Sequence, residues 1–79
     1  ETRVEHGSAM VGKKIVELKI PQSVLIILIY RNGKYFAPNG STVIEENDGL
    51  TLMSENDADI GIMTLMCAPV LENDALEKK

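Results

Sequence analysis

The fold of this 79-residue chain is decided by the stretch Ser23–Gly40, which reads Ser-Val-Leu-Ile-Ile-Leu-Ile-Tyr-Arg-Asn-Gly-Lys-Tyr-Phe-Ala-Pro-Asn-Gly. Its first half, Val24–Tyr30, is an unbroken apolar run rich in β-branched residues, which predicts a buried strand. Alternation along a strand gives one face with Val24, Ile26, Leu28 and Tyr30, and a second face with Leu25, Ile27 and Ile29. Because both faces are apolar, the strand needs cover on both sides.

A tight turn follows this strand directly. The dipeptide Asn32-Gly33 accepts the positive φ angles of a two-residue type I′ turn, so Arg31–Lys34 predicts a hairpin. Residues Tyr35–Ala37 then return as an antiparallel strand. We interpret this turn as the element that sets strand register, and not as a binding motif.

The segment before the strand changes its pattern. Residues 3–6 predict a short first strand around Val4. Further along, Val11, Ile15 and Leu18 recur at the spacing of one helical stripe, which predicts a short helix packed on the sheet. Pro21 cannot continue a helix, so we expect this one to end near Lys19.

The second half of the chain alternates turn signals with short apolar runs. Turns are expected at residues 38–40 and 45–49, and strands at 42–44 and 50–53. An Asp57 cap predicts a helix over 58–66 that ends before Pro69, although the alternation of Ile60, Ile62, Thr64 and Met66 also fits a strand. The whole chain therefore predicts one α+β domain of order β-α-β-β-β(-β)-α, with a mainly antiparallel sheet, one short helix packed on it, a C-terminal helix and a flexible tail over 68–79.

Length and charge restrict the class of protein. A single small core gives limited stability, and the lone Cys67 allows no intramolecular disulfide, so we expect self-association as the remaining way to bury apolar surface. The net charge is −4 without a basic cluster, which argues against nucleic-acid binding. No run reaches the roughly 18–20 apolar residues of a membrane span, and no signal peptide is expected at the N-terminus. A chain that starts at Glu1 without Met is expected to be a fragment of a longer protein.

None of the reactive side chains forms a recognisable catalytic or metal-binding motif. We interpret His6 as a surface or strand residue and Cys67 as a buried, inert thiol, since neither has a partner at suitable spacing. The acidic residues lack the spacing of a calcium loop, and the methionines Met53, Met63 and Met66 are interpreted as core residues. Asp48 is predicted to accept backbone N–H groups of its own turn. We therefore expect a binding or regulatory domain and no enzyme.

Several short motifs together resemble one family: Val11-Gly12-Lys13, Glu17-Leu18-Lys19-Ile20-Pro21, Leu25-Ile26, Ile29-Tyr30-Arg31-Asn32-Gly33, Pro38-Asn39-Gly40-Ser41-Thr42-Val43, Asp48 and Leu50. Their order resembles the TrkA-C family, the C-terminal domain of regulators of potassium conductance, over residues 4–60. The pairing of Leu-x-x-Pro with Pro-x-Gly-x-Thr looks most like the copy in bacterial potassium/proton antiporters. One departure is Asn47, which stands where the family often has glycine, with Gly49 after the aspartate instead.

The resemblance implies a dimeric domain on the cytoplasmic face of the bacterial inner membrane, without direct insertion, behind a transporter domain of the same chain. In some relatives the ligand is cyclic di-AMP, held near the dimer interface. The family's ligand-binding positions match Lys19, Ile20, Pro21, Pro38 and Asn39 of this chain, where cyclic di-AMP or another small regulatory ligand is the candidate and no cofactor is required. The face carrying Leu25, Ile27 and Ile29 is expected to contact the second subunit.

Two functions follow from this resemblance. In the first, ligand binding or rearrangement of the dimer biases the gating of an attached cation antiporter, since a ligand shifts an equilibrium through its different affinity for the two states. In the second, the domain only dimerises the transporter and binds no small molecule.

Overall fold

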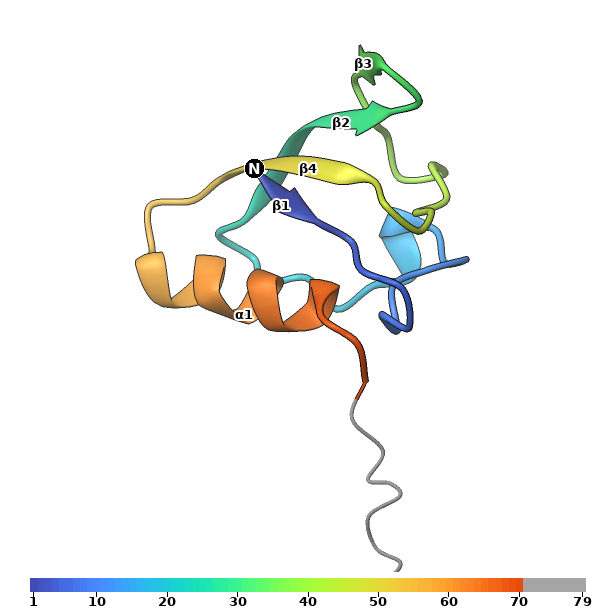
Figure 1. Cartoon of the computed structure of the whole chain (residues 1–79). Helices are drawn as coiled ribbons and strands as arrows, with labels where there is room; N and C mark the ends of the chain where they lie inside the picture. The colour runs from blue at the N-terminus through green and yellow to red at the C-terminus, as the bar shows by residue number, and fades with distance from the viewer. Residues whose placement is uncertain (71–79) are drawn as a thin grey trace, which may run out of the picture.

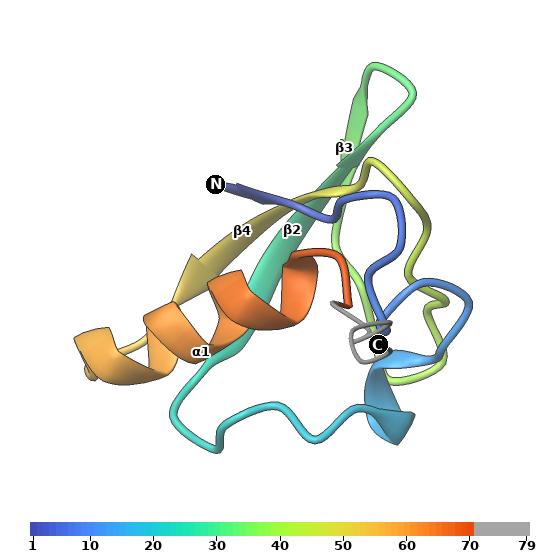
Figure 2. The ribbon, with the colours of Figure 1, turned by 60° about the horizontal axis from the view of Figure 1, so that its bottom comes forward.

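The computed structural model describes residues 1–70 of the chain. Four strands form one sheet of order β1-β4-β2-β3, in which every neighbouring pair is antiparallel. The α-helix found within residues 1–70, α1, lies across one face of this sheet (Figures 1 and 2). The bounds of the elements are β1 Thr2–Arg3, the 3-10 turn η1 Ile15–Glu17, β2 Leu25–Arg31, β3 Lys34–Phe36, β4 Gly49–Met53 and α1 Asp57–Cys67. The predicted α+β class is confirmed.

The hairpin between β2 and β3 forms as its sequence predicts. Asn32 and Gly33 both have positive φ angles, 53° and 83°, as a type I′ turn requires. The turn closes with Arg31 opposite Lys34, and Tyr30 opposite Tyr35. Local turn chemistry therefore fixes the register of this half of the sheet.

A β-bulge at Ile27 changes the predicted faces of β2. Ile26 pairs with Leu52 and Leu28 pairs with Thr51, so Ile27 is an extra residue without a partner of its own on β4. The bulge reverses the alternation, and Ile26 and Ile29 both face the core. The prediction that Leu25, Ile27 and Ile29 share one face was wrong, because simple alternation does not continue through a bulge.

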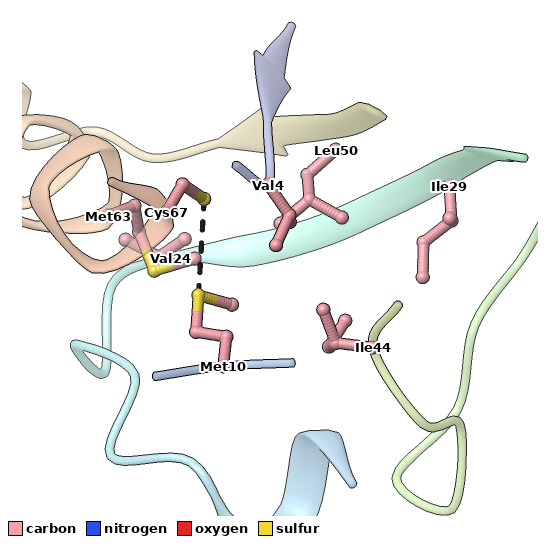
Figure 3. Close-up of a cluster of buried hydrophobic side chains, with 8 residues drawn as sticks. All are labelled: Val4, Met10, Val24, Ile29, Ile44, Leu50, Met63 and Cys67. Atoms are coloured by element: carbon pink, nitrogen blue, oxygen red, sulfur yellow. Dashed lines mark hydrogen bonds between the residues drawn. The ribbon is translucent and has the colours of Figure 1, made fainter. Parts of the chain in front are cut away.

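The core lies on one face of the sheet, against α1 at one end and against the segments that carry Met10 and Ile44 at the other, as Figure 3 shows. It consists of eight buried apolar residues: Val4, Met10, Val24, Ile29, Ile44, Leu50, Met63 and Cys67. The predicted core role holds for Met63, which is fully buried, but not for Met53, whose relative exposure is 59%. Met53 pairs with Leu25 on the outer face of the sheet, which explains its exposure.

The C-terminal segment forms a helix and not the alternative strand. Asn56 provides the N-cap, since its side-chain Oδ1 accepts the N–H of Ala58 at 2.9 Å. The predicted cap, Asp57, is instead the first helical residue, where its negative charge suits the helix N-terminus. The helix ends at Cys67, two residues before Pro69, as the sequence predicts.

The helix predicted between Val11 and Lys19 is wrong, as only the short turn η1 forms there. Gly12 has φ of 85°, which interrupts a helix before it can begin. The backbone pairs instead with residues 42–44, through Gly12 N–H to Ile44 O at 2.8 Å and Ile15 N–H to Thr42 O at 2.9 Å. Residues 42–44, predicted as a strand of the sheet, form only a bridge with this segment. This face of the sheet is therefore covered by α1 together with these two paired segments, which supply Met10 and Ile44 to the core.

The two ends of the described chain are joined by backbone hydrogen bonds. Glu5 N–H donates to Cys67 O at 2.9 Å, and Val70 N–H donates to Gly7 O at 3.1 Å. The first strand covers Thr2–Arg3 and is thus shorter and earlier than predicted. Of the predicted tail over 68–79, Pro69 forms a bridge with Ser8 and Val70 pairs with Gly7, and 71–79 lie outside the described residues. Within residues 1–70, no helix has the length and apolar character needed to cross a membrane.

Candidate functional site

A cavity of about 420 Å³ lies where η1, the segment before β2 and the segment after β3 meet. Its lining comes from three separate parts of the chain. The lining residues are Ile15, Val16, Leu18, Ile20, Pro21, Gln22, Val24, Leu25, Ile26, Pro38 and Asn39. A cavity of this volume falls within the range of small-ligand sites.

Four of the five predicted ligand-binding residues lie in this cavity. Ile20 and Pro21 line it from one side, and Pro38 and Asn39 line it from another, although seventeen residues separate the two pairs. Lys19 is exposed and is not among the lining residues. The structure therefore brings together the segments that the family resemblance selects, but leaves the one predicted charge outside the lining.

Backbone hydrogen bonds hold the lining segments in place. Val16 N–H donates to Gly40 O at 3.0 Å, which ties η1 to the turn after Asn39. This turn is closed by Asn39 N–H donating to Thr42 Oγ1 at 2.9 Å. The side of the cavity that includes Pro21 is fixed by Val24 N–H donating to Pro21 O at 3.0 Å. The cavity is thus framed by ordered turns on both sides.

The lining is apolar apart from two amide side chains. Nine of the eleven lining residues are apolar, and the other two are Gln22 and Asn39. Ser41 N–H already donates to Asn39 Oδ1 at 2.8 Å, which orients this amide. No lining residue has a side chain that titrates, so the lining offers packing and neutral hydrogen bonds and no acid–base chemistry.

Part of the lining was not predicted from the sequence. Val16 and Gln22 were not predicted, and Ile15 and Leu18 were predicted as a helical stripe on the sheet. The signal that could have found them is Gly12, because a glycine at this point permits the left-handed conformation that replaces the helix by a turn.

The sheet face opposite α1 is apolar and has no cover from any described element. It exposes Leu25, Met53 and Tyr35, with relative exposures of 60%, 59% and 59%. Tyr35 contacts its cross-strand neighbour Tyr30, with ring centroids 4.7 Å apart. We call these four residues and Leu28 the outer face. Leu25 belongs to the outer face and also lines the cavity, so the two surfaces are continuous.

The predicted dimer contacts occupy different environments. Leu25 and Ile27 are exposed, with Ile27 at 37%, whereas Ile29 has no exposed surface and packs in the chain's own core. Ile29 is therefore not available to a second subunit, which corrects its assignment. The cause is the bulge at Ile27, which directs Ile29 inward.

A second hollow, of about 190 Å³, lies at the other end of the outer face. It is lined by Glu1, Arg3, Tyr30, Tyr35, Asn47 and Gly49. Asn47 has φ of 74°, the left-handed conformation that favours glycine and that asparagine tolerates. The departure from the family glycine thus changes the residue type and keeps the turn.

An ion pair between Arg31 and Asp48 links the end of β2 to the turn before β4. The Asp48 carboxylate is fully buried and accepts Arg31 Nε–H at 2.8 Å and Nη2–H at 2.7 Å. It also accepts the N–H of Glu45 at 2.9 Å, as the predicted turn role of Asp48 requires. The hydrogen bond to Asp48 raises the pKa of Arg31 above its ordinary value. This ion pair is structural, and its residues do not line the larger cavity.

The histidine lies at the surface and the cysteine is buried, as the sequence predicts. His6 is exposed, and its Nδ1 lies 3.0 Å from Glu46 Oε1, a hydrogen bond that raises the pKa of His6. Cys67 is buried, 3.9 Å from the sulfur of Met10, and burial raises the pKa of its thiol to about 11. Among residues 1–70, no three His, Cys, Asp or Glu side chains are grouped as metal ligands.

The structure is thus a small α+β domain with an apolar cavity next to an exposed face of its sheet. The TrkA-C domain family matches residues 1–58, and the chain belongs to this family. The resemblance drawn from the sequence motifs is thereby confirmed.

A curated protein and a solved structure are among the known proteins to which the chain is similar. The Trk system potassium uptake protein TrkA homologue of Archaeoglobus fulgidus is 40% identical over 57 residues, which are 72% of this chain and 13% of that protein. The chain thus spans about an eighth of the length of this relative. A solved structure described as "Structure of RCK domain with cda" has the same fold, with a TM-score of 0.69, 12% identity, and coverage of 81% of this chain and 91% of that one.

Proposed function

We propose that the chain is a regulatory domain of a potassium transport system, in which a ligand in the larger cavity and self-association through the outer face bias transporter gating. The observation that carries this proposal is the position of Leu25, which lines the cavity and is also exposed on the outer face. A ligand that packs against Leu25 changes the surface offered to a second copy. Ligand binding and self-association are thereby linked, as regulation requires.

The comparisons support the biological setting of this proposal. The curated relative is named as a potassium uptake protein, and the solved RCK domain is described as containing "cda". We place the domain on the cytoplasmic face of the bacterial inner membrane, behind a transporter domain of the same chain. The sequence motifs favour a potassium/proton antiporter as this transporter.

The chemistry of the lining favours a ligand with a flat, largely apolar part. Proline and aliphatic side chains supply packing, and the amides of Gln22 and Asn39 can bind a hydrogen-bonding edge. A nucleobase has both features, which keeps cyclic di-AMP as the first candidate. Its phosphates would have to be neutralised from outside the lining, where Lys19 is exposed.

One observation favours the second function, a dimerisation module without a ligand. No lining residue is charged, so the cavity has no counter-charge of its own for an anion. In that case the outer face alone would carry the function. Neither reading involves catalysis, because the lining has no residue that could act as nucleophile, acid or base.

Sedimentation and thermal shift of the 79-residue chain separate the two functions. The outer face predicts a dimer at micromolar concentration that Met53→Asp converts to a monomer, while Leu65→Asp on α1, a position 76% exposed, leaves the dimer intact. Cyclic di-AMP, mononucleotides and potassium are screened as ligands, and one of them should raise the melting temperature of the chain. The Gln22→Ala variant should show a smaller rise with the same ligand. A monomer at high micromolar concentration would refute both functions, and a dimer without any ligand response would leave only the dimerisation module.

A further inference from the structure

The edge of β2 that faces away from β4 is only half occupied. β3 pairs with β2 at Ile29, Tyr30 and Arg31, while the ladder with β4 runs from Leu25 to Tyr30 with the bulge at Ile27. Within the described part of the chain, Leu25, Ile26 and Leu28 thus have a strand partner on the β4 edge only, and the bulged Ile27 has none on either edge. Backbone N–H and C=O groups alternate between the two edges of a strand, so this half of β2 presents unpaired donors and acceptors.

Pro38 explains why β3 does not continue along this edge. A longer β3 would place Ala37 and Pro38 opposite the first half of β2, but proline has no N–H to donate to a ladder. The chain turns away after Phe36 and closes a turn at Asn39 instead. The space beside the open edge is therefore not filled by the hairpin itself.

The larger cavity lies beside this open edge. Leu25 and Ile26 of β2 form one wall, and Pro38 and Asn39 of the departing segment form another. Val16 stands at the rim with a relative exposure of 73%. An open strand edge next to an apolar cavity is the arrangement by which domains bind an extended peptide, with backbone hydrogen bonds along the edge and a side chain in the cavity.

The charge on the side of the cavity formed by residues 13–19 indicates which peptide it suits. Residues 13–19, which supply Ile15, Val16 and Leu18 to the lining, contain three lysines and one glutamate, whereas the whole chain has a net charge of −4. Lys14 and Lys19 are both exposed beside lining residues in the sequence. A partner with acidic residues around an apolar one complements this local positive charge.

We propose that an extended acidic peptide segment adds as a strand to the open edge of β2 at Leu25–Leu28 and inserts one aliphatic side chain into the cavity. Such a segment would occupy the cavity assigned above to a small regulatory ligand, so the two would exclude each other. In this respect the inference rests on the proposed function. It does not need the small ligand, because strand addition depends on the edge alone.

The test uses a fluorescein-labelled peptide of sequence Asp-Val-Thr-Val-Thr-Val-Asp and the 79-residue chain without any other ligand. Fluorescence anisotropy should show saturable binding, and amide hydrogen exchange should slow at Leu25–Leu28. Val16→Asp, at the rim, should weaken binding by about tenfold, and Leu65→Asp, an equally exposed position on α1, should leave it unchanged. Replacing both terminal Asp residues of the peptide by Lys should also weaken binding.

Two N-methylated peptides distinguish strand addition from simple packing in the cavity. Methylation of every second backbone nitrogen removes the donors of one peptide edge and leaves the side chains unchanged. One of the two possible patterns should weaken binding by about tenfold, because two hydrogen bonds are lost, and the other should have little effect. Equal binding of both patterns, or no binding at millimolar peptide, would refute the proposal. If protection from amide exchange at Leu25–Leu28 increased with protein concentration in the absence of peptide, the edge would be occupied by a second copy of the chain, which would also refute the proposal. None of these results would change the expected response of the melting temperature to a small ligand.

Discussion

The Arg31 guanidinium donates two hydrogen bonds to the buried Asp48 carboxylate, of 2.8 Å from Nε and 2.7 Å from Nη2. The same Nη2 donates to Val43 O at 2.9 Å, and Phe36 lies under the guanidinium with its ring centroid 5.0 Å from Cζ. One side chain therefore joins the end of β2 to the segment that leads from the cavity to β4. Glu45 adds a more exposed contact at 3.2 Å.

Asp48→Asn should destabilise the domain by about 3 kcal/mol, because it leaves the Arg31 charge without its buried partner. Arg31→Lys should also destabilise the domain, since a lysine cannot form the two-point contact. Urea unfolding followed by circular dichroism measures both effects. The matched control is Glu45→Gln, which removes a half-exposed partner of the same arginine and should cost less than about 1 kcal/mol. Equal unfolding free energies for Asp48→Asn and Glu45→Gln would contradict the role given to Asp48.

Asn47→Ala should destabilise the domain by about 1 kcal/mol, while Asn47→Gly should be neutral or slightly stabilising. The reason is the φ of 74° at this position, which alanine adopts at a cost and glycine adopts freely. Thermal unfolding of the two variants beside the wild type measures the difference. If alanine and glycine behaved alike, the left-handed turn at Asn47 would be refuted.

The pKa of His6 should lie above its ordinary value of 6.5, because the hydrogen bond to Glu46 stabilises the protonated ring. This stabilisation is fully present below pH 6.5 and is lost as the pH rises through the raised pKa. Titration of the ring protons by NMR measures the pKa directly. Glu46→Gln should bring it back toward 6.5, and an unchanged value in this variant would rule out the pairing.

Cys67 should resist thiol reagents at pH 8 in the folded chain and react rapidly in urea. Burial raises the pKa of the thiol to about 11 from 9.0, so the reactive thiolate is scarce in the native state. Since the folded pKa is the higher one, the protonated thiol favours folding below pH 9, and this contribution is lost as the pH rises toward 11. Unfolding midpoints at pH 8 and pH 10.5 should differ more for the wild type than for Cys67→Ala. A fast reaction in the native state would show that the thiol is accessible.

The parts of the fold that depend on local chemistry were predictable from the sequence. The turn at Asn32-Gly33 and the end of α1 before Pro69 need only the conformational preferences of a few neighbouring residues. The role of Asp48 in its own turn is of the same kind, whereas its pairing with Arg31 was not predicted, because seventeen residues separate the two.

The errors concern features set by distant parts of the chain. The stripe of Val11, Ile15 and Leu18 has helical spacing, yet backbone pairing with residues 42–44 overrides it. The bulge at Ile27 likewise follows from the register with β4, which no local pattern reveals. The cavity residues Ile20, Pro21, Pro38 and Asn39 were found only through the resemblance to a family, since nothing in their own chemistry marks them as a site.

The bulge residue Ile27 can be removed from β2 without changing which of its neighbours face the core. If Ile27 were deleted, Leu25, Ile26, Leu28 and Ile29 would alternate without interruption, and the same two side chains would still face inward. Loss of this one residue would thus leave Ile26 and Ile29 facing inward and would remove only the exposed side chain of Ile27. The length of β2 is therefore free to change by this residue while the interior of the domain stays the same.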